Sequence, residues 1–156
     1  MLVNEEQQQI ADAVRSFAQE RLRPFAEQWD KDHRFPREAI EEMAALGLFG
    51  MLVPEQWGGS DTGYVAYAMA LEEIAAGDGA CSTIMSVHNS VGCVPILRFG
   101  SEQQKRAFLT PLATGVMLGA FALTEPQAGS DASSLKTRAR REGEHYVLNG
   151  SKQFIT

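Results

Sequence analysis

The chain of 156 residues is long enough for one domain with a buried core, or for one domain and part of a second. Its formal net charge of −6 argues against a nucleic-acid partner, because a phosphate backbone requires a basic protein face. Its two cysteines, Cys81 and Cys93, are too few for a disulfide framework and match no metal-ligand set, so both are expected to be buried, reduced thiols.

The N-terminus shows no targeting signal. It is acidic, and it lacks the basic segment followed by an apolar segment that a secretory signal contains. No run of about 18 apolar residues predicts a membrane-spanning helix. These features predict a cytoplasmic protein.

Apolar residues at helical spacing predict two helices in the first part of the chain. Asn4 is a suitable N-terminal cap for the first helix, and Pro24 is expected to bend it. The second helix is predicted over about residues 36–47. A long Gly-rich loop over residues 50–63 follows. It is expected either to be a connector anchored by a buried Trp57 or to have a functional role.

The chain then continues as helix to about residue 114. The predicted helices span about residues 64–76, 80–99 and 101–114, with Pro95 as a kink or break in the second and Ser101 and Gln104 as a capping box for the third. His88 lies in an apolar helix and is expected to be a hydrogen-bonded interior histidine rather than a catalytic one. Glu72 and Glu73 are expected on a solvated face or in a helix contact.

The pattern changes from helical to β after residue 115. The apolar run "MLGAFALTE" (residues 117–125) has the length of a buried strand, and "SLKTRARRE" (residues 134–142) alternates. The pair Asn149-Gly150 predicts a hairpin turn. We therefore expect a mainly α fold, with an N-terminal all-α domain over residues 1–115 and an incomplete β domain over residues 116–156.

The predicted strands leave open edges and a poorly covered face. The chain is therefore expected to be the first part of a larger protein, or to need a partner that completes its sheet.

Small polar side chains gather in "ALTEPQAGSDASS", residues 122–134. A strand delivers Thr124 to a turn, and Gly129 allows a backbone to approach a ligand closely. The hydroxyl groups of Thr124 and Ser130, with neighbouring N–H groups, suit a flat ligand edge that carries carbonyls and ring nitrogens. Asp131 can instead bind its own backbone in an ordinary turn. The composition alone leaves both interpretations open.

Four segments in order resemble the acyl-CoA dehydrogenase family. "FALTEPQAGSD" (residues 121–131) resembles that family's flavin-binding signature, and "VPEQWGGSDTG" (residues 53–63) resembles its loop between the second and third helices. "FGSEQQKRAFLTPLATG" (residues 99–115) and "YVLNGSKQFIT" (residues 146–156) resemble the helix entering the β domain and the strands that close over the flavin. The resemblance implies a helical bundle followed by the first strands of a barrel-like middle domain, without the family's C-terminal helical domain.

The resemblance also implies roles for residues at the start of the β domain. Phe121, Leu123 and Thr124 match positions that line the flavin ring, with backbone groups and the Thr124 hydroxyl toward its pyrimidine side. Ser130 matches a residue where the flavin meets the pantetheine arm of the substrate. Glu125 does not match the family's catalytic base, and a structural role in the turn is expected for it.

The last residues match the wall of the flavin site. Phe154 stands where many family members have a tryptophan against the ring face, so an aromatic face is kept and the indole N–H is lost. Ile155 and Thr156 follow, and the Thr156 hydroxyl matches a group that faces the flavin N5 region.

The activity implied by the resemblance is the α,β-dehydrogenation of an acyl-CoA thioester in fatty acid β-oxidation. FAD is the expected cofactor, electron-transfer flavoprotein the expected acceptor, and a dimer or tetramer the expected assembly. The family's base is a glutamate of the C-terminal domain, so no catalytic residue is expected in these 156 residues, and the chain alone is expected to be inactive.

Two other functions fit the same residues. One is an acyl-CoA oxidase or flavin monooxygenase, and the other is a non-catalytic helical interaction module. The segment "CSTIMSVHNSVG" (residues 81–92) resembles bacterial short-chain and branched-chain members, although its small residues are equally consistent with helix packing.

Overall fold

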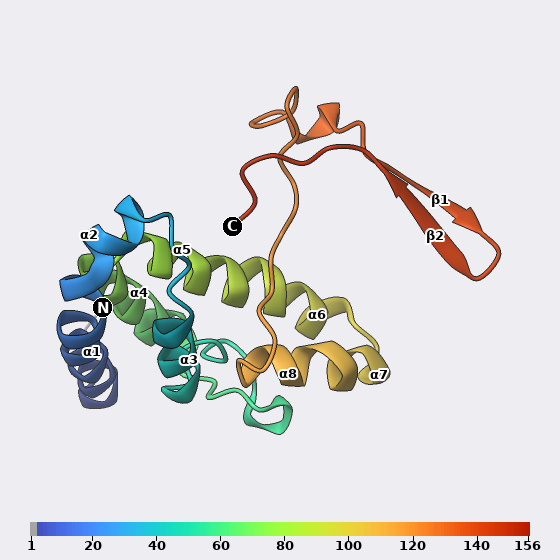
Figure 1. Cartoon of the computed structure of the whole chain (residues 1–156). Helices are drawn as coiled ribbons and strands as arrows, with labels where there is room; N and C mark the ends of the chain where they lie inside the picture. The colour runs from blue at the N-terminus through green and yellow to red at the C-terminus, as the bar shows by residue number, and fades with distance from the viewer. Residues whose placement is uncertain (1–2) are drawn as a thin grey trace. The chain divides into compact units, whose positions relative to one another are not determined.

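The computed structural model describes residues 3–156. The chain forms two compact units, of which the first ends at Gly119 and the second begins at Ala120. The first unit is helical, and the second contains a red β-hairpin (Figure 1). The expected fold class, a helical bundle followed by the start of a β domain, is confirmed.

Two helices of the first unit begin at the capping residues that the sequence predicts. Asn4 accepts a hydrogen bond from the Gln7 N–H, and Ser101 accepts one from the Gln104 N–H, so both predicted caps are confirmed. The α-helices are α1 (Glu5–Phe17), α2 (Arg23–Lys31), α3 (Arg37–Ala45), α4 (Gly63–Gly77), α5 (Gly79–Val87), α6 (Val94–Phe99), α7 (Glu102–Gln104) and α8 (Thr110–Ala113).

Three prolines lie in the first turn of a helix that directly continues a preceding helix. Proline removes one backbone N–H and its ring collides with the carbonyl four residues earlier, so it normally kinks or ends a helix. Here a wider π-helical turn precedes each proline and accommodates the missing bond. Neither Pro24 nor Pro95 therefore ends its helical stretch. The π-helical turns are Ala18–Leu22 before Pro24, His88–Cys93 before Pro95, and Lys105–Leu109 before Pro111.

The core of the helical unit is made by α1, α3, α4 and α5 with the chain that follows α3. Its largest fully buried apolar side chains include Phe49, Leu22, Met43, Ile74 and Met85. Burial of these apolar surfaces is the main force that holds the helices together.

Both cysteines are buried and free, as expected. Burial raises the pKa of the Cys81 thiol, and it raises the pKa of Cys93 to about 12. Both therefore stay protonated at neutral pH, which makes them poor nucleophiles.

One helical stretch within residues 3–156, Gly79–Phe99, is long and apolar enough to cross a membrane by length and composition. Its fully buried side chains Cys81, Met85 and Cys93 pack inside the helical unit. The share of the stretch that is buried inside the structure is 28%, and a single helix of this kind is weak evidence for a membrane span.

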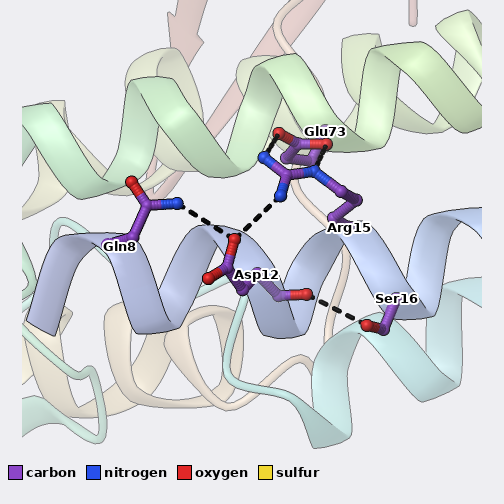
Figure 2. A network of polar contacts seen from close by, with 5 residues as sticks. All are labelled: Gln8, Asp12, Arg15, Ser16 and Glu73. Atoms are coloured by element: carbon purple, nitrogen blue, oxygen red, sulfur yellow. Dashed lines mark hydrogen bonds and ion pairs between the residues drawn. The ribbon is translucent and has the colours of Figure 1, made fainter. Parts of the chain in front are cut away.

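A network of charges joins α1 to α4 (Figure 2). The Arg15 guanidinium donates to both carboxylate oxygens of Glu73, at 3.1 Å and 2.7 Å, and to Asp12 at 2.8 Å. Gln8 also donates to Asp12. Glu73 therefore makes a helix contact, one of the two roles expected for it, whereas Glu72 is exposed.

We expect this network to add little stability, because Arg15 is half exposed and exposed ion pairs are screened by water and salt. In a double-mutant cycle of Arg15→Met and Glu73→Gln, we expect a coupling below about 1 kcal/mol, so the second substitution should cost slightly less once the first is present. Urea unfolding at low and high salt measures this coupling, which should shrink as salt is added. Strictly additive effects of the two substitutions would contradict the contact.

The loop over residues 50–63 is a folded structure. A short 3₁₀ turn, Glu55–Trp57, buries Trp57 against the end of the helical unit. The Thr62 N–H donates to the Met51 carbonyl at 3.0 Å, and the Ser60 N–H donates to the Gly50 carbonyl at 3.0 Å. The two sides of the loop thus pair with each other, which favours the anchored connector.

The second unit contains β1 (Arg138–Glu142) and β2 (His145–Asn149), which pair antiparallel with Arg140 opposite Val147. Gly143, with φ of +60°, begins the two-residue turn between them. The turn predicted at Asn149-Gly150 is therefore wrong. A Cβ at Gly150 would lie 2.1 Å from the Thr137 hydroxyl oxygen, so this glycine permits close packing instead of a turn.

The strand predicted over residues 117–125 is also wrong. These residues are extended, and within residues 3–156 they form no ladder beyond one bridge between Glu125 and Ala128. An apolar run becomes a strand only when a neighbouring backbone pairs with it over several residues. Among the described residues, the neighbouring segment that ends at Thr156 makes one backbone hydrogen bond to this run, from the Gln153 N–H to the Thr124 carbonyl, which is too few for a ladder.

Candidate functional site

The candidate site lies in the second unit, where two extended segments run next to each other. The Gln153 N–H donates to the Thr124 carbonyl at 2.9 Å, which joins the segment from Phe121 to the segment that ends at Thr156. Six of the seven residues predicted to contact a flavin lie on these two segments, and Ser130 lies in the turn that follows the first segment. The seven residues are Phe121, Leu123, Thr124, Ser130, Phe154, Ile155 and Thr156.

The apolar members of this set are exposed. Phe154 is 83% exposed, and Phe121, Leu123 and Ile155 are also classed among the exposed large apolar residues. The φ of Phe154 is +54°, a conformation that non-glycine residues rarely adopt. Each of these exposed apolar side chains would be stabilised if a ligand or another part of the protein covered it.

The polar members of the set differ in exposure. Thr124 is half-buried, whereas Ser130 and Thr156 are exposed. Gly129 has open space where a side chain would stand, which fits the close backbone approach expected there. Within residues 3–156, neither the Thr124 N–H nor the Ser130 hydroxyl donates to a protein group.

Asp131 stabilises the turn. Its carboxylate accepts from the Ser133 N–H at 3.1 Å and from the hydroxyl groups of Ser133 and Ser134 at 2.5 Å each. These donors lower the pKa of Asp131, with the Ser133 hydroxyl contributing most. The ordinary turn considered for this residue therefore forms, and it orders the chain just after Ser130.

Glu125 is the buried centre of the site and is only 3% exposed. Its own backbone pairs with Ala128 in both directions at 3.0 Å, which closes the turn. Its carboxylate accepts from the Lys136 N–H at 2.7 Å, the Thr137 N–H at 2.9 Å, the Gln127 amide at 2.6 Å and the Lys152 ammonium at 2.9 Å.

These neighbours hold the pKa of Glu125 far below its usual range. The nearby Thr137 hydroxyl contributes most, followed by the Lys136 N–H, and the Lys152 ammonium adds to the effect. A carboxylate that is ionised, buried and already saturated with donors is a poor proton acceptor. The structural role expected for Glu125 is thus supported, and a role as catalytic base is not.

Lys152 is a residue of the candidate site that sequence reasoning missed. It lies 27 positions from Glu125, so no local spacing indicates the pair. The ammonium also donates to the Leu123 carbonyl at 2.9 Å. The sequence does show that Lys152 stands close to Phe154, in a segment already predicted to line the site. Only the folded chain shows that Lys152 contacts Leu123 and Glu125.

His88, in the helical unit, is fully buried and hydrogen-bonded, as expected. Its Nδ1 accepts from the Gly119 N–H at 3.1 Å, so Nε2 carries the proton and donates to the Leu112 carbonyl at 3.0 Å. Burial lowers the pKa of His88, and the Leu112 contact opposes this only in part. His88 therefore holds the backbone where the chain leaves the helical unit.

The residues at the site fit a flat ligand that is apolar on its faces and polar at one edge. Exposed aromatic and aliphatic side chains supply the apolar contact, and hydroxyl and backbone N–H groups supply donors. The fold thus defines a helical domain followed by part of a β domain, which carries the candidate site.

Family comparisons identify this class. Residues 4–116 match the family described as acyl-CoA dehydrogenase, N-terminal domain, and residues 120–156 match the acyl-CoA dehydrogenase middle domain. The chain therefore belongs to the acyl-CoA dehydrogenase family.

Two relatives cover almost the whole chain. The human mitochondrial short-chain specific acyl-CoA dehydrogenase is 48% identical over 97% of this chain and 37% of its own length. A Bacillus subtilis acyl-CoA dehydrogenase is 48% identical over all of this chain and 41% of its own length. The chain thus spans about two fifths of the relatives it matches.

Solved structures agree with the fold. A chain from a study of the electron transferring flavoprotein of Acidaminococcus fermentans has a TM-score of 0.94 at 41% identity, covering 99% of this chain and 41% of that one. An acyl-CoA dehydrogenase complexed with FAD from Bacillus anthracis has a TM-score of 0.91 at 39% identity, covering 98% and 27%.

Proposed function

We propose that this chain supplies the helical domain and one edge of the flavin site of an FAD-dependent acyl-CoA dehydrogenase. The observation that carries the proposal is the site itself, where exposed apolar side chains and free donors lie on two joined segments of a family member. The FAD complex of the Bacillus anthracis relative supports the choice of cofactor.

The residues of the chain act by binding and orientation. Phe121, Leu123 and Phe154 would cover the apolar ring system, and the Thr124 hydroxyl and N–H would donate to its polar edge. Ser130 would contact the region where the substrate thioester meets the cofactor. The chemistry that FAD would supply when bound is the uptake of a hydride from the substrate β-carbon. Donors already in place stabilise the negative charge that this transfer brings to the cofactor.

Proton removal from the substrate α-carbon is proposed to fall to a glutamate outside these 156 residues. Glu125 is buried and ionised with all its donors in place, and Glu73 is engaged by Arg15. Neither carboxylate is available as a base.

The test is anaerobic titration of the complete gene product, loaded with FAD, with a short-chain acyl-CoA. We expect the visible flavin absorbance to be bleached by the substrate and restored by electron transferring flavoprotein. Rapid restoration by oxygen alone would favour an acyl-CoA oxidase or monooxygenase. A protein that binds no FAD would favour the non-catalytic interaction module.

We propose electron transferring flavoprotein as the acceptor, and a dimer or tetramer as the assembly. The Acidaminococcus fermentans structure supports the acceptor. Short acyl chains are the proposed substrate class, supported by the human short-chain relative. The cytoplasmic location remains a prediction from the N-terminal sequence.

We expect Thr124→Val to weaken FAD binding about tenfold, because one hydrogen bond to the cofactor is worth about 1 kcal/mol or more. Quenching of flavin fluorescence measures the affinity. The matched control is Thr83→Val on α5, where an exposed threonine donates only to the Gly79 carbonyl of its own helix. Unchanged affinity in the Thr124 variant would remove this residue from the site.

A further inference from the structure

The orientation of one peptide group at the site depends on Lys152. Its ammonium donates to the Leu123 carbonyl at 2.9 Å and to the Glu125 carboxylate at 2.9 Å. The Lys152 side chain is 25% exposed, so most of its surface is covered by the protein. The buried Glu125 carboxylate supplies the opposite charge that keeps the ammonium in place.

The Leu123 carbonyl belongs to the same peptide group as the Thr124 N–H. All peptide bonds among residues 3–156 are trans, and in a planar trans peptide the C=O and N–H point in opposite directions. Because Lys152 holds the carbonyl on its own side, the Thr124 N–H points away from Lys152. Within the described residues this N–H has no acceptor.

The next peptide group is held in the same way. The Gln153 N–H donates to the Thr124 carbonyl at 2.9 Å, so two successive carbonyls of this segment are bound by residues of the segment beside it. A methionine at position 152 would have a similar length but no ammonium group, so the Leu123 carbonyl would lose this donor. The peptide group between Leu123 and Thr124 would then be held less firmly.

We propose that Lys152 is a positioning residue that fixes the peptide between Leu123 and Thr124, so that the Thr124 N–H stays directed at the polar edge of the flavin. This inference rests on the proposed flavin site and adds to it a residue that does not itself touch the cofactor. A donor held in advance costs no reorganisation when negative charge arrives on the cofactor.

The experiment compares Lys152→Met with wild-type complete protein. We expect about tenfold weaker FAD binding by fluorescence quenching and a more negative flavin midpoint potential by dye equilibration, because a donor to the reduced form is lost. Lys152→Arg should restore much of both, since a guanidinium can donate to the same carbonyl. The control is Lys136→Met, which removes an equal charge from an exposed side chain.

A double variant guards against misfolding, since Lys152→Met alone leaves Glu125 buried without its cation. Glu125→Gln with Lys152→Met removes both charges and still removes the donor to Leu123, so it should show the weaker affinity and lower potential. Glu125→Gln alone retains Lys152 and should change both less.

The outcomes separate the two claims. Wild-type protein that binds no FAD would overturn the proposed function, and the inference with it. Wild-type binding with an unchanged affinity and potential in the double variant would overturn only the role of Lys152. The role of Lys152 would also be overturned if its variants had a lower melting temperature but an unchanged flavin midpoint potential. An equal shift of the potential in Lys136→Met would overturn it as well.

Discussion

Replacement of His88 by alanine is expected to destabilise the helical unit by about 4 kcal/mol. The substitution leaves the buried Leu112 carbonyl and Gly119 N–H without partners, at about 1–3 kcal/mol each, and it opens a cavity beside Phe49. Urea unfolding followed by circular dichroism measures the loss. The control is His145→Ala, on the exposed hairpin, which should change stability by less than about 0.5 kcal/mol. Equal effects of the two variants would contradict the buried network.

The same histidine gives a pH dependence with a definite sign. The pKa of His88 is lower in the folded protein than its value of about 6.5 in the unfolded chain. As the pH falls below about 6.5, the unfolded chain therefore takes up a proton at His88 that the folded protein does not, which favours unfolding. The stability that neutral His88 contributes is fully present above about pH 6.5 and is lost as the pH falls toward the folded pKa. The difference between wild type and His88→Gln, measured by urea unfolding from neutral to acidic pH, should therefore shrink in acid. A difference that grows in acid would contradict the lowered pKa.

Replacement of Gly59 by alanine is expected to cost about 3 kcal/mol or more, the upper end for forcing extra atoms into a packed site. A Cβ there would lie 1.9 Å from the Val53 carbonyl oxygen and 2.6 Å from the Gly50 carbonyl oxygen. Both obstacles are backbone atoms, so the loop over residues 50–63 must open to admit the methyl group. Because this loop buries Trp57, tryptophan fluorescence and thermal melting should both report the change.

Gly79→Ala is the matched control for this substitution. A Cβ at Gly79 meets no atom within 4 Å, and the residue lies in the first turn of α5. Alanine should therefore be neutral or slightly stabilising there, because it reduces the entropy of the unfolded chain. Two variants with similar melting temperatures would show that the loop opens at little cost.

The starts of two helices were predictable because their capping signals are local. Asn4 and Ser101 each bond to a residue three positions later, so the sequence alone contains both partners. The flavin-binding signature was also recognisable, because its residues are contiguous from Phe121 to Asp131. The β region was predicted less well, since the hairpin turn and the first strand were both misplaced.

The sequence by itself thus determined the helical character, two of the caps, the presence of β structure in the last part of the chain and the family. Only the tertiary structure decided that Lys152 binds Glu125 and Leu123, that His88 binds Leu112 and Gly119, and that Gly150 is required by close packing. The physical reason is the separation of the interacting residues along the sequence. Caps and periodicity arise within three or four neighbouring residues, whereas these contacts join residues 13 to 31 positions apart and form only when the chain folds.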